Sequence, residues 1–223
     1  DHRDLHKEYR RQRQMCIRDS DKTWNGYTIH DTPDEQGAVL IDMNGRVVQH
    51  WTKLTAVPSP FRILPGGYVM GDTVPRRPHQ EAVALAQLDW DGNVVWEFQN
   101  FEEVETEDGD TIWASRLHHD WQREGSPIGY YAPNAAPMVD RGNTLILSHT
   151  NLVNSEITDK RLEDDVLFEV TWEGNITWTW RASDHVEEFG FSDAERNALH
   201  RSVQWNENLS LKHISEPTRR TPI

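Results

Sequence analysis

Short runs of alternating apolar and polar residues recur along the chain, each interrupted by a glycine turn. Three segments have an apolar run, a turn of Asn-Gly, Asp-Gly or Glu-Gly, and a second run closing on tryptophan; they span residues 38–51, 85–98 and 166–180. Alternation gives a strand one buried and one exposed face, and glycine supplies the positive φ that a tight turn requires. Each segment is therefore predicted to be a β-hairpin.

A second repeat of strand, glycine-containing turn and strand lies between these hairpins, at residues 61–71 and 138–148. Both kinds of unit together supply four strands, the content of a propeller blade. The turn glycines Gly45 and Gly92 are 47 positions apart, in the range of blade repeats of about 40–50 residues. The pattern predicts an all-β fold, specifically a partial β-propeller of about two to three four-stranded blades.

Three further features refine this expectation. The acidic segment 101–110 and the Gly/Pro-rich segment 125–137 lengthen the unit before Gly174 and are expected to form long loops. A serine followed three residues later by glutamate predicts one short helix over residues 192–199, at the rim of the blades. Tryptophans that follow the turns are expected to pack in the core; they are Trp51, Trp96, Trp178 and Trp180.

The two ends of the chain differ from its middle. Residues 1–20 and 209–223 have no apolar periodicity, and both resemble translated sequencing-adapter sequence; native disordered tails are the alternative. The expected organisation is a non-native or disordered head (1–20), an incomplete β-propeller domain (21–208) and a non-native or disordered tail (209–223). Cys16, the single cysteine, lies in the head, so the middle has no thiol chemistry.

Charge and hydropathy exclude several partners. The formal net charge is −14, and residues 21–208 hold 14 Lys and Arg against 32 Asp and Glu. Such an acidic segment does not favour nucleic acid or anionic membranes. No stretch approaches the roughly 20 apolar residues of a membrane span. A local cationic site for a small anionic substrate remains compatible with this charge.

The densest group of reactive side chains is the run from Arg116 to Arg123, which contains His118, His119 and Asp120. A neutral histidine nitrogen can attack a sulfuryl or phosphoryl group, and a neighbouring carboxylate can fix its tautomer. The alternative is that the histidines only satisfy backbone groups or face water. Adjacent residues on a strand point to opposite faces, so at most one imidazole is expected to face a shared cavity.

Other site chemistries fit less well. The adjacent His118, His119 and Asp120 do not have the spacing of a zinc or iron site, so no metal and no cofactor is predicted. Residues 89–93 resemble a calcium loop but lack the downstream glutamate. The chain has no nucleophile elbow, phosphate-binding glycine loop or dinucleotide fingerprint. His79, His149 and Arg76-Arg77 receive no role.

Several of these motifs, in this order, resemble the bacterial arylsulfotransferase (aryl-sulfate sulfotransferase) family over residues 22–207. The motifs are residues 26–29 with 37–42, then 61–67, 88–98, His118-His119-Asp120-Trp121-Gln122-Arg123, and 167–174. The resemblance implies a six-bladed propeller, periplasmic or secreted, that transfers sulfate from a phenolic sulfate ester to a phenol through a sulfated histidine.

On this resemblance His119, or His118, would bind the sulfuryl oxygens or assist proton transfer, with Asp120 and Arg123 at the substrate. The implied partners are small aromatic sulfate esters and phenols. Later histidine motifs of the family have no match before residue 223, although His200 is a possible substitute, so this chain is expected to lack turnover. The competing functions are a non-catalytic propeller that binds or scaffolds partners, and a metal-dependent lyase or hydrolase.

Overall fold

The computed structural model describes residues 26–32, 37–55, 60–76, 81–106, 108–125, 136–201 and 206–209, with only the backbone described at 74–76, 198–201 and 206–209. The strands are β1 (Tyr27–Asp31), β2 (Ala38–Asp42), β3 (Val47–Trp51), β4 (Arg62–Leu64), β5 (Tyr68–Arg76), β6 (Glu81–Leu88), β7 (Val94–Phe98), β8 (Phe101–Glu105), β9 (Thr111–Ser115), β10 (Leu117–Arg123), β11 (Thr144–Val153), β12 (Arg161–Val170), β13 (Ile176–Arg181) and β14 (Asn206–Leu209). The helical segments are η1 (Pro65–Gly67), η2 (Ala182–Phe189) and α2 (Asp193–Arg201).

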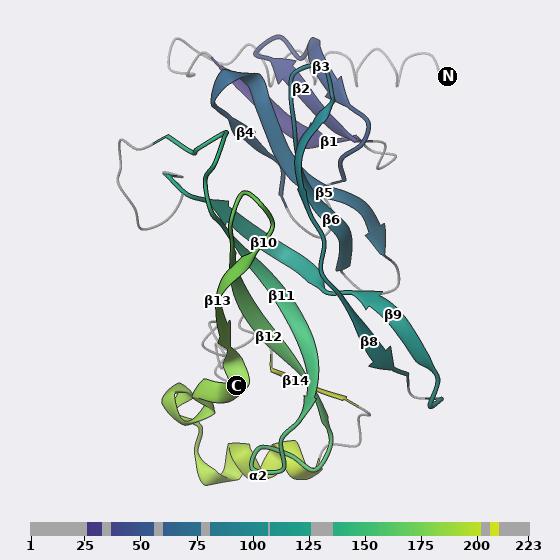
Figure 1. Ribbon diagram of the computed structural model, residues 1–223, viewed down its shortest axis with the longest axis vertical. Helices are drawn as coiled ribbons and strands as arrows, with labels where there is room; N and C mark the ends of the chain where they lie inside the picture. Colours follow the sequence, from purple (N-terminus) through teal and green to yellow (C-terminus); the bar gives the residue numbers. More distant parts are fainter. Residues whose placement is uncertain are drawn as a thin grey trace, which may run out of the picture.

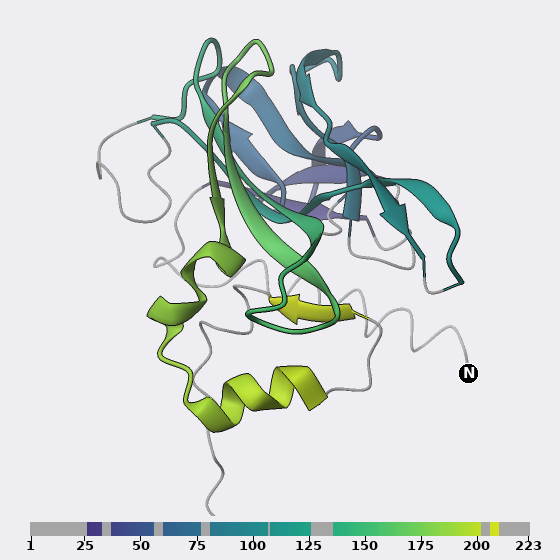
Figure 2. The same ribbon diagram turned by 60° about the horizontal axis from the view of Figure 1, so that its bottom comes forward.

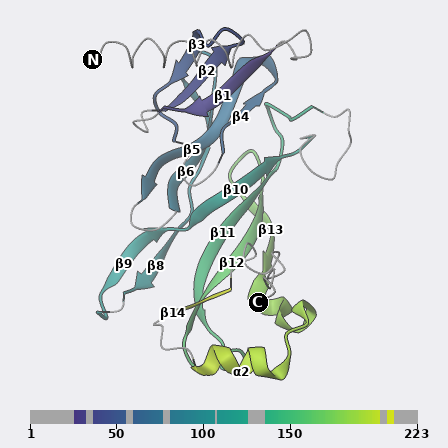
Figure 3. The same ribbon diagram turned by 180° about the vertical axis from the view of Figure 1, so that it is seen from behind.

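These strands form three sheets. β1, β2 and β3 make an antiparallel sheet at one end of the molecule (Figure 1). The largest sheet runs β13-β12-β11-β10-β6-β5-β4, with β7 added beside β6 and β14 parallel to β12. β8 and β9 form a separate ribbon that extends away from the other strands (Figure 3). The prediction of an all-β fold is confirmed, whereas blades arranged about an axis are not shown by the described residues.

The three glycine hairpins predicted from sequence all form, as β2–β3, β6–β7 and β12–β13. Their turns share one geometry, in which the residue three before the glycine accepts the glycine N–H through its carbonyl oxygen. Gly45, Gly92 and Gly174 have φ of 72°, 82° and 85°. A left-handed backbone is unfavourable for residues with a Cβ atom, which explains glycine at these turns.

Two predictions about the second unit are wrong. Residues 101–110 are not a loop: β8 and β9 pair around a fourth turn of the same kind, in which Gly109 donates its N–H to the Thr106 carbonyl (3.0 Å). Met138 and Val139 do not form a strand; the Met138 N–H instead bonds the Glu124 carbonyl (2.9 Å). The hairpin partner of β11 is therefore β10, across the segment 125–137, which is only partly described.

Apolar side chains gather in three clusters. The largest lies on the main sheet and includes Leu85, Trp96, Leu117 and Trp121. A second joins the three-stranded sheet to β5 and β6 around Trp51. The prediction that the tryptophans pack in the core holds for Trp51 and Trp96 and in part for Trp180, which is half-buried against the third cluster, whereas Trp178 is 45% exposed. Both lie on β13, an edge strand that no further strand covers among the described residues.

The helical segments η2 and α2 lie beyond the ends of β11 to β13 (Figure 2). α2 begins after Ser192, whose N–H and hydroxyl both contact the Glu195 carboxylate (2.8 and 2.7 Å), so the predicted helix start is confirmed. The sequence pattern predicts one helix and gives no signal for η2, which packs Ala182 and Val186 into the third apolar cluster with Leu162. No helix in the described ranges is long and apolar enough to cross a membrane.

Candidate functional site

The predicted histidine pair lies where β10 is irregular. Leu117 pairs with Ser148 and Trp121 with Ile146, so three residues of β10 lie opposite the single residue Leu147 of β11. Within this bulge His119 has φ of 63°, a left-handed conformation. A bulge breaks the alternation of side chains, and bulges often occur next to active sites.

The bulge brings both imidazoles to the same place. The ring centroids of His118 and His119 lie 4.7 Å apart at an interplanar angle of 61°. The prediction that adjacent histidines point to opposite faces is therefore wrong, because the left-handed residue turns the His119 ring back toward its neighbour. His118 is only 6% exposed, whereas His119 is half-buried. His119 is thus the more accessible of the two.

A third histidine, on β11, completes what we call the imidazole cluster (His118, His119 and His149). The ring of His149 stacks on that of His118 with centroids 4.4 Å apart, and its backbone N–H bonds the Arg116 carbonyl (2.9 Å). Sequence analysis gave His149 no role. The available signal was a histidine that follows the apolar run Leu145–Leu147 in one predicted strand, but its pairing with β10 could not be deduced from spacing.

Acidic residues surround the cluster. Nε2 of His149 donates to Oε1 of Glu81 at 2.7 Å, and Nε2 of His118 lies 3.2 Å from Oδ1 of Asp165 without the alignment of a hydrogen bond. Burial lowers the pKa of His149, the hydrogen bond to Glu81 raises it, and the nearby His118 lowers it further. His149 is therefore neutral near pH 7. With its proton on Nε2, its Nδ1 carries the lone pair.

Arg116 is the cation beside this cluster and is 2% exposed. Its Nη1 donates to Glu81 (3.1 Å), its Nε to the His149 carbonyl (3.1 Å) and its Nη2 to the Asn151 side chain (2.6 Å). Burial lowers the pKa of Arg116, and the charges of Glu163, Glu81 and Glu102 oppose that effect. A buried guanidinium needs such partners, since an unpaired buried charge is strongly destabilising.

Asp120 and Arg123, the other predicted site residues, have different neighbours. The Asp120 carboxylate is 59% exposed and contacts Arg62 (2.6 Å) and the Trp121 N–H (2.7 Å). Arg123 is fully buried, with Cζ 4.7 Å from the ring centroid of Trp96 and 5.1 Å from that of Trp172. Burial lowers the pKa of Arg123 to about 10. The structure brings His118, His119 and His149 together. Within the described part of the chain it does not show the side chain of Asp120 or of Arg123 against this cluster.

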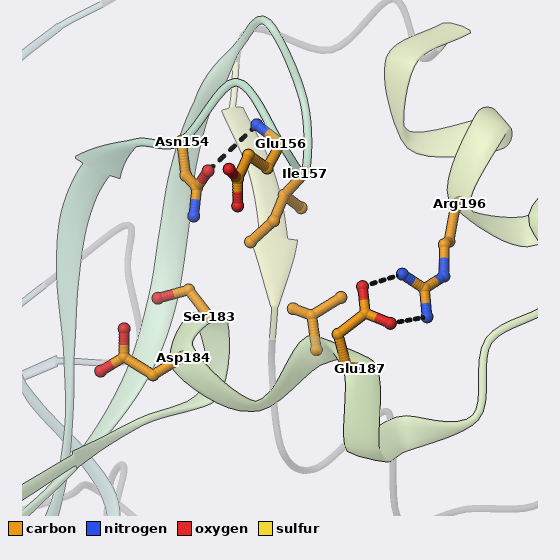
Figure 4. A pocket seen from close by; sticks show the side chains of 8 residues that line it. Asn154, Glu156, Ile157, Ser183, Asp184, Glu187 and Arg196 are labelled. Atoms are coloured by element: carbon orange, nitrogen blue, oxygen red, sulfur yellow. Dashed lines mark hydrogen bonds and ion pairs between the residues drawn. The ribbon is translucent and has the colours of Figure 1, made fainter.

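A cavity of about 150 Å³ lies elsewhere, between the turn after β11, η2 and α2 (Figure 4). Its wall includes Asn154, Glu156 and Asp184, and the Glu187–Arg196 ion pair lies on the α2 side. Arg196 is already bound to Glu187 through both terminal nitrogens. The cavity therefore offers mainly acidic groups and does not suit an anionic substrate.

No protein-family model matches the chain, and no curated protein compared with it does so either. The resemblance to arylsulfotransferases therefore depends on the order of the motifs and on the His-His-Asp element, and it stays a prediction.

Proposed function

We propose that the imidazole cluster is the sulfuryl-binding part of an arylsulfotransferase-like enzyme, which moves sulfate from a phenolic sulfate ester to a phenol without a nucleotide donor. The observation that carries the proposal is the bulge at His119, where a left-handed non-glycine residue places two adjacent imidazoles in contact. Unfavourable backbone of this kind is concentrated at functional sites. The proposal includes the propeller and the periplasmic or secreted location that the resemblance implies.

The roles follow from accessibility. His119, half-buried, is the member that meets the sulfuryl oxygens, while His118 and His149 lie behind it. In the first half-reaction a neutral imidazole nitrogen forms a bond to sulfur as the aryl oxygen–sulfur bond breaks, and the departing phenolate takes the proton that the other nitrogen of the sulfated ring releases. In the second half, the acceptor phenol returns a proton to that nitrogen, its oxygen bonds sulfur and the nitrogen–sulfur bond breaks, which restores the neutral imidazole. Donors held near the transferred group stabilise its charge.

The alternative is a non-catalytic β-rich module that binds or scaffolds a partner. One observation favours it: His118, His149 and Arg116 are each less than 10% exposed, and Arg116 is surrounded by partners. In that case the cluster would only hold β6, β10 and β11 together. The two functions differ in whether His119 contacts a ligand.

Binding of p-nitrophenyl sulfate to the 223-residue chain tests the proposal, measured by calorimetry at fixed ionic strength. We expect saturable binding that His119→Ala weakens by about tenfold or more, as loss of a charge-assisted contact should. His30→Ala, which removes an exposed histidine of β1, is the matched control. A longer protein containing this segment should release nitrophenol only when a phenol acceptor is present. Absence of binding by the folded chain, or equal binding by both variants, would favour the scaffold.

A further inference from the structure

Three ligand-type side chains converge beside the imidazole cluster, and we call them the Glu–His–Glu group (Glu81, His149 and Glu163). They come from β6, β11 and β12, and one ligand atom of each lies within 4.8 Å of the others. His149 Nε2 is 2.7 Å from Glu81 Oε1 and 3.7 Å from Glu163 Oε1. Ligands about 2.0–2.2 Å from one ion lie roughly 3–4 Å apart, so small carboxylate rotations suffice.

The charge at this place favours a further cation. Arg116 contacts Glu81 at 3.1 Å, Glu163 at 3.5 Å and Glu102 at 3.7 Å. One guanidinium therefore faces three carboxyl side chains, of which that of Glu81 is 2% exposed, that of Glu163 20% and that of Glu102 33%. Buried carboxylates are stabilised when they are paired or coordinate a metal.

The His118 ring has a buried nitrogen, Nε2, for which the described residues supply no hydrogen bond. The His118 side chain is 6% exposed, and its ring stacks on that of His149, the imidazole of the Glu–His–Glu group. Its Nε2 forms no hydrogen bond within the described part of the chain. Buried polar atoms without a partner are rare in folded proteins, and an unplaced ion or water is a common reason. The surroundings of His149 therefore include a second buried imidazole whose Nε2 has no hydrogen bond from the described residues and lies 3.2 Å from the Asp165 carboxylate.

We propose that Glu81, His149 and Glu163 bind a divalent transition-metal ion such as Zn²⁺. One imidazole and two carboxylates form a ligand set that suits such ions and leaves a position open for water or substrate. Coordination uses the Nε2 lone pair of the neutral imidazole, so the proton that Nε2 donates to Glu81 has to move to Nδ1. Arg116 stays anchored by the His149 carbonyl and Asn151, as an outer partner of the ligating carboxylates.

Uptake of Zn²⁺ by the untagged full chain tests this site, through metal retained after dialysis and affinity measured against a chelating indicator. The chain has 11 histidines, so the comparison between variants is decisive rather than uptake itself. Glu163→Gln and His149→Gln should each lower the Zn²⁺ affinity of one site per chain by at least about tenfold. Replacement of a residue that only hydrogen-bonds a metal ligand already lowers metal affinity by that much. Glu103→Gln, an exposed glutamate of β8, and His30→Gln are the matched controls and should bind as the unchanged chain does.

A measurement on the unchanged chain covers the case in which a variant does not fold. Addition of Zn²⁺ should shift the ring nitrogen resonances of His149 at one equivalent and leave those of His30 unchanged. Equal affinity in folded Glu163→Gln and Glu103→Gln, or an unshifted His149 ring, overturns the metal site. This inference does not depend on the proposed function. His119→Ala should bind p-nitrophenyl sulfate more weakly and bind Zn²⁺ as the unchanged chain does, so either proposal can be refuted while the other stands.

Discussion

His119 shows how one backbone conformation determines the candidate site. A left-handed conformation costs an ordinary L-residue about 1–2 kcal/mol, and histidine tolerates it better than most. In this conformation the ring of His119 contacts that of His118, and β10 pairs with β11 again from Trp121 onward. Since a regular strand would send these side chains to opposite faces, the conformation rather than the sequence order creates the cluster.

The left-handed backbone at position 119 predicts that glycine and alanine differ there in stability. Both substitutions remove the imidazole, but only glycine adopts φ of 63° without strain. His119→Gly should therefore be more stable than His119→Ala by about 1 kcal/mol. Urea unfolding of both variants measures the difference. Equal stabilities would mean that the bulge relaxes when the imidazole is removed, and that it is not fixed by the surrounding strands.

At the scale of elements, the turns could be predicted and the bulge could not. Glycine after Asn, Asp or Glu gives a local signal, and all three predicted hairpins form around it. The β8–β9 hairpin carries the same Asp-Gly signal at Asp108-Gly109, but its glutamates obscured the alternation. Contact between His118 and His149 depends on how β10 pairs with β11, a long-range register that no local pattern encodes.

Asp164 joins β12 to η2 and makes this connection sensitive to pH. Its carboxylate accepts the Ser183 N–H (2.9 Å) and hydroxyl (2.6 Å). Burial raises the pKa of Asp164 to about 6, against the opposing effect of these hydrogen bonds. Because the folded chain holds this proton more tightly than the unfolded chain, the contribution to stability is present below about pH 4. It is lost as the pH rises through about 6.

Comparison with Asp164→Asn isolates this effect, because asparagine keeps the shape and does not titrate. Between pH 4 and pH 7 the free energy of unfolding of the unchanged chain should fall relative to that of Asp164→Asn by about 2 kcal/mol. Denaturant titrations at several pH values measure it, with Asp140→Asn as the exposed control. A constant difference between the two proteins across this range would show that Asp164 ionises normally.

At the scale of the whole molecule, the outer strand of each glycine hairpin carries exposed apolar side chains. β3 exposes Val47 and Val48, β7 exposes Val94 and Val95, and β13 exposes Ile176 and Trp178. β3 and β13 also end their sheets in the strand order. In a propeller such surfaces would be covered by neighbouring blades, so this distribution supports the propeller proposal without establishing it.

Uncovered edges of this kind promote association between chains, since their backbone groups can pair with another strand. The chain should therefore associate as its concentration rises, and lysine on β13 should reduce this association because a charge on an edge strand opposes pairing. Light scattering after size exclusion compares Ile176→Lys and Trp178→Lys with Trp90→Lys. Trp90 is 43% exposed, close to the 45% of both β13 residues, but it lies in the turn between β6 and β7 and not on a strand. If all three variants scatter alike, general surface hydrophobicity rather than the free edge drives association, and β13 is not the surface that a neighbouring sheet would cover.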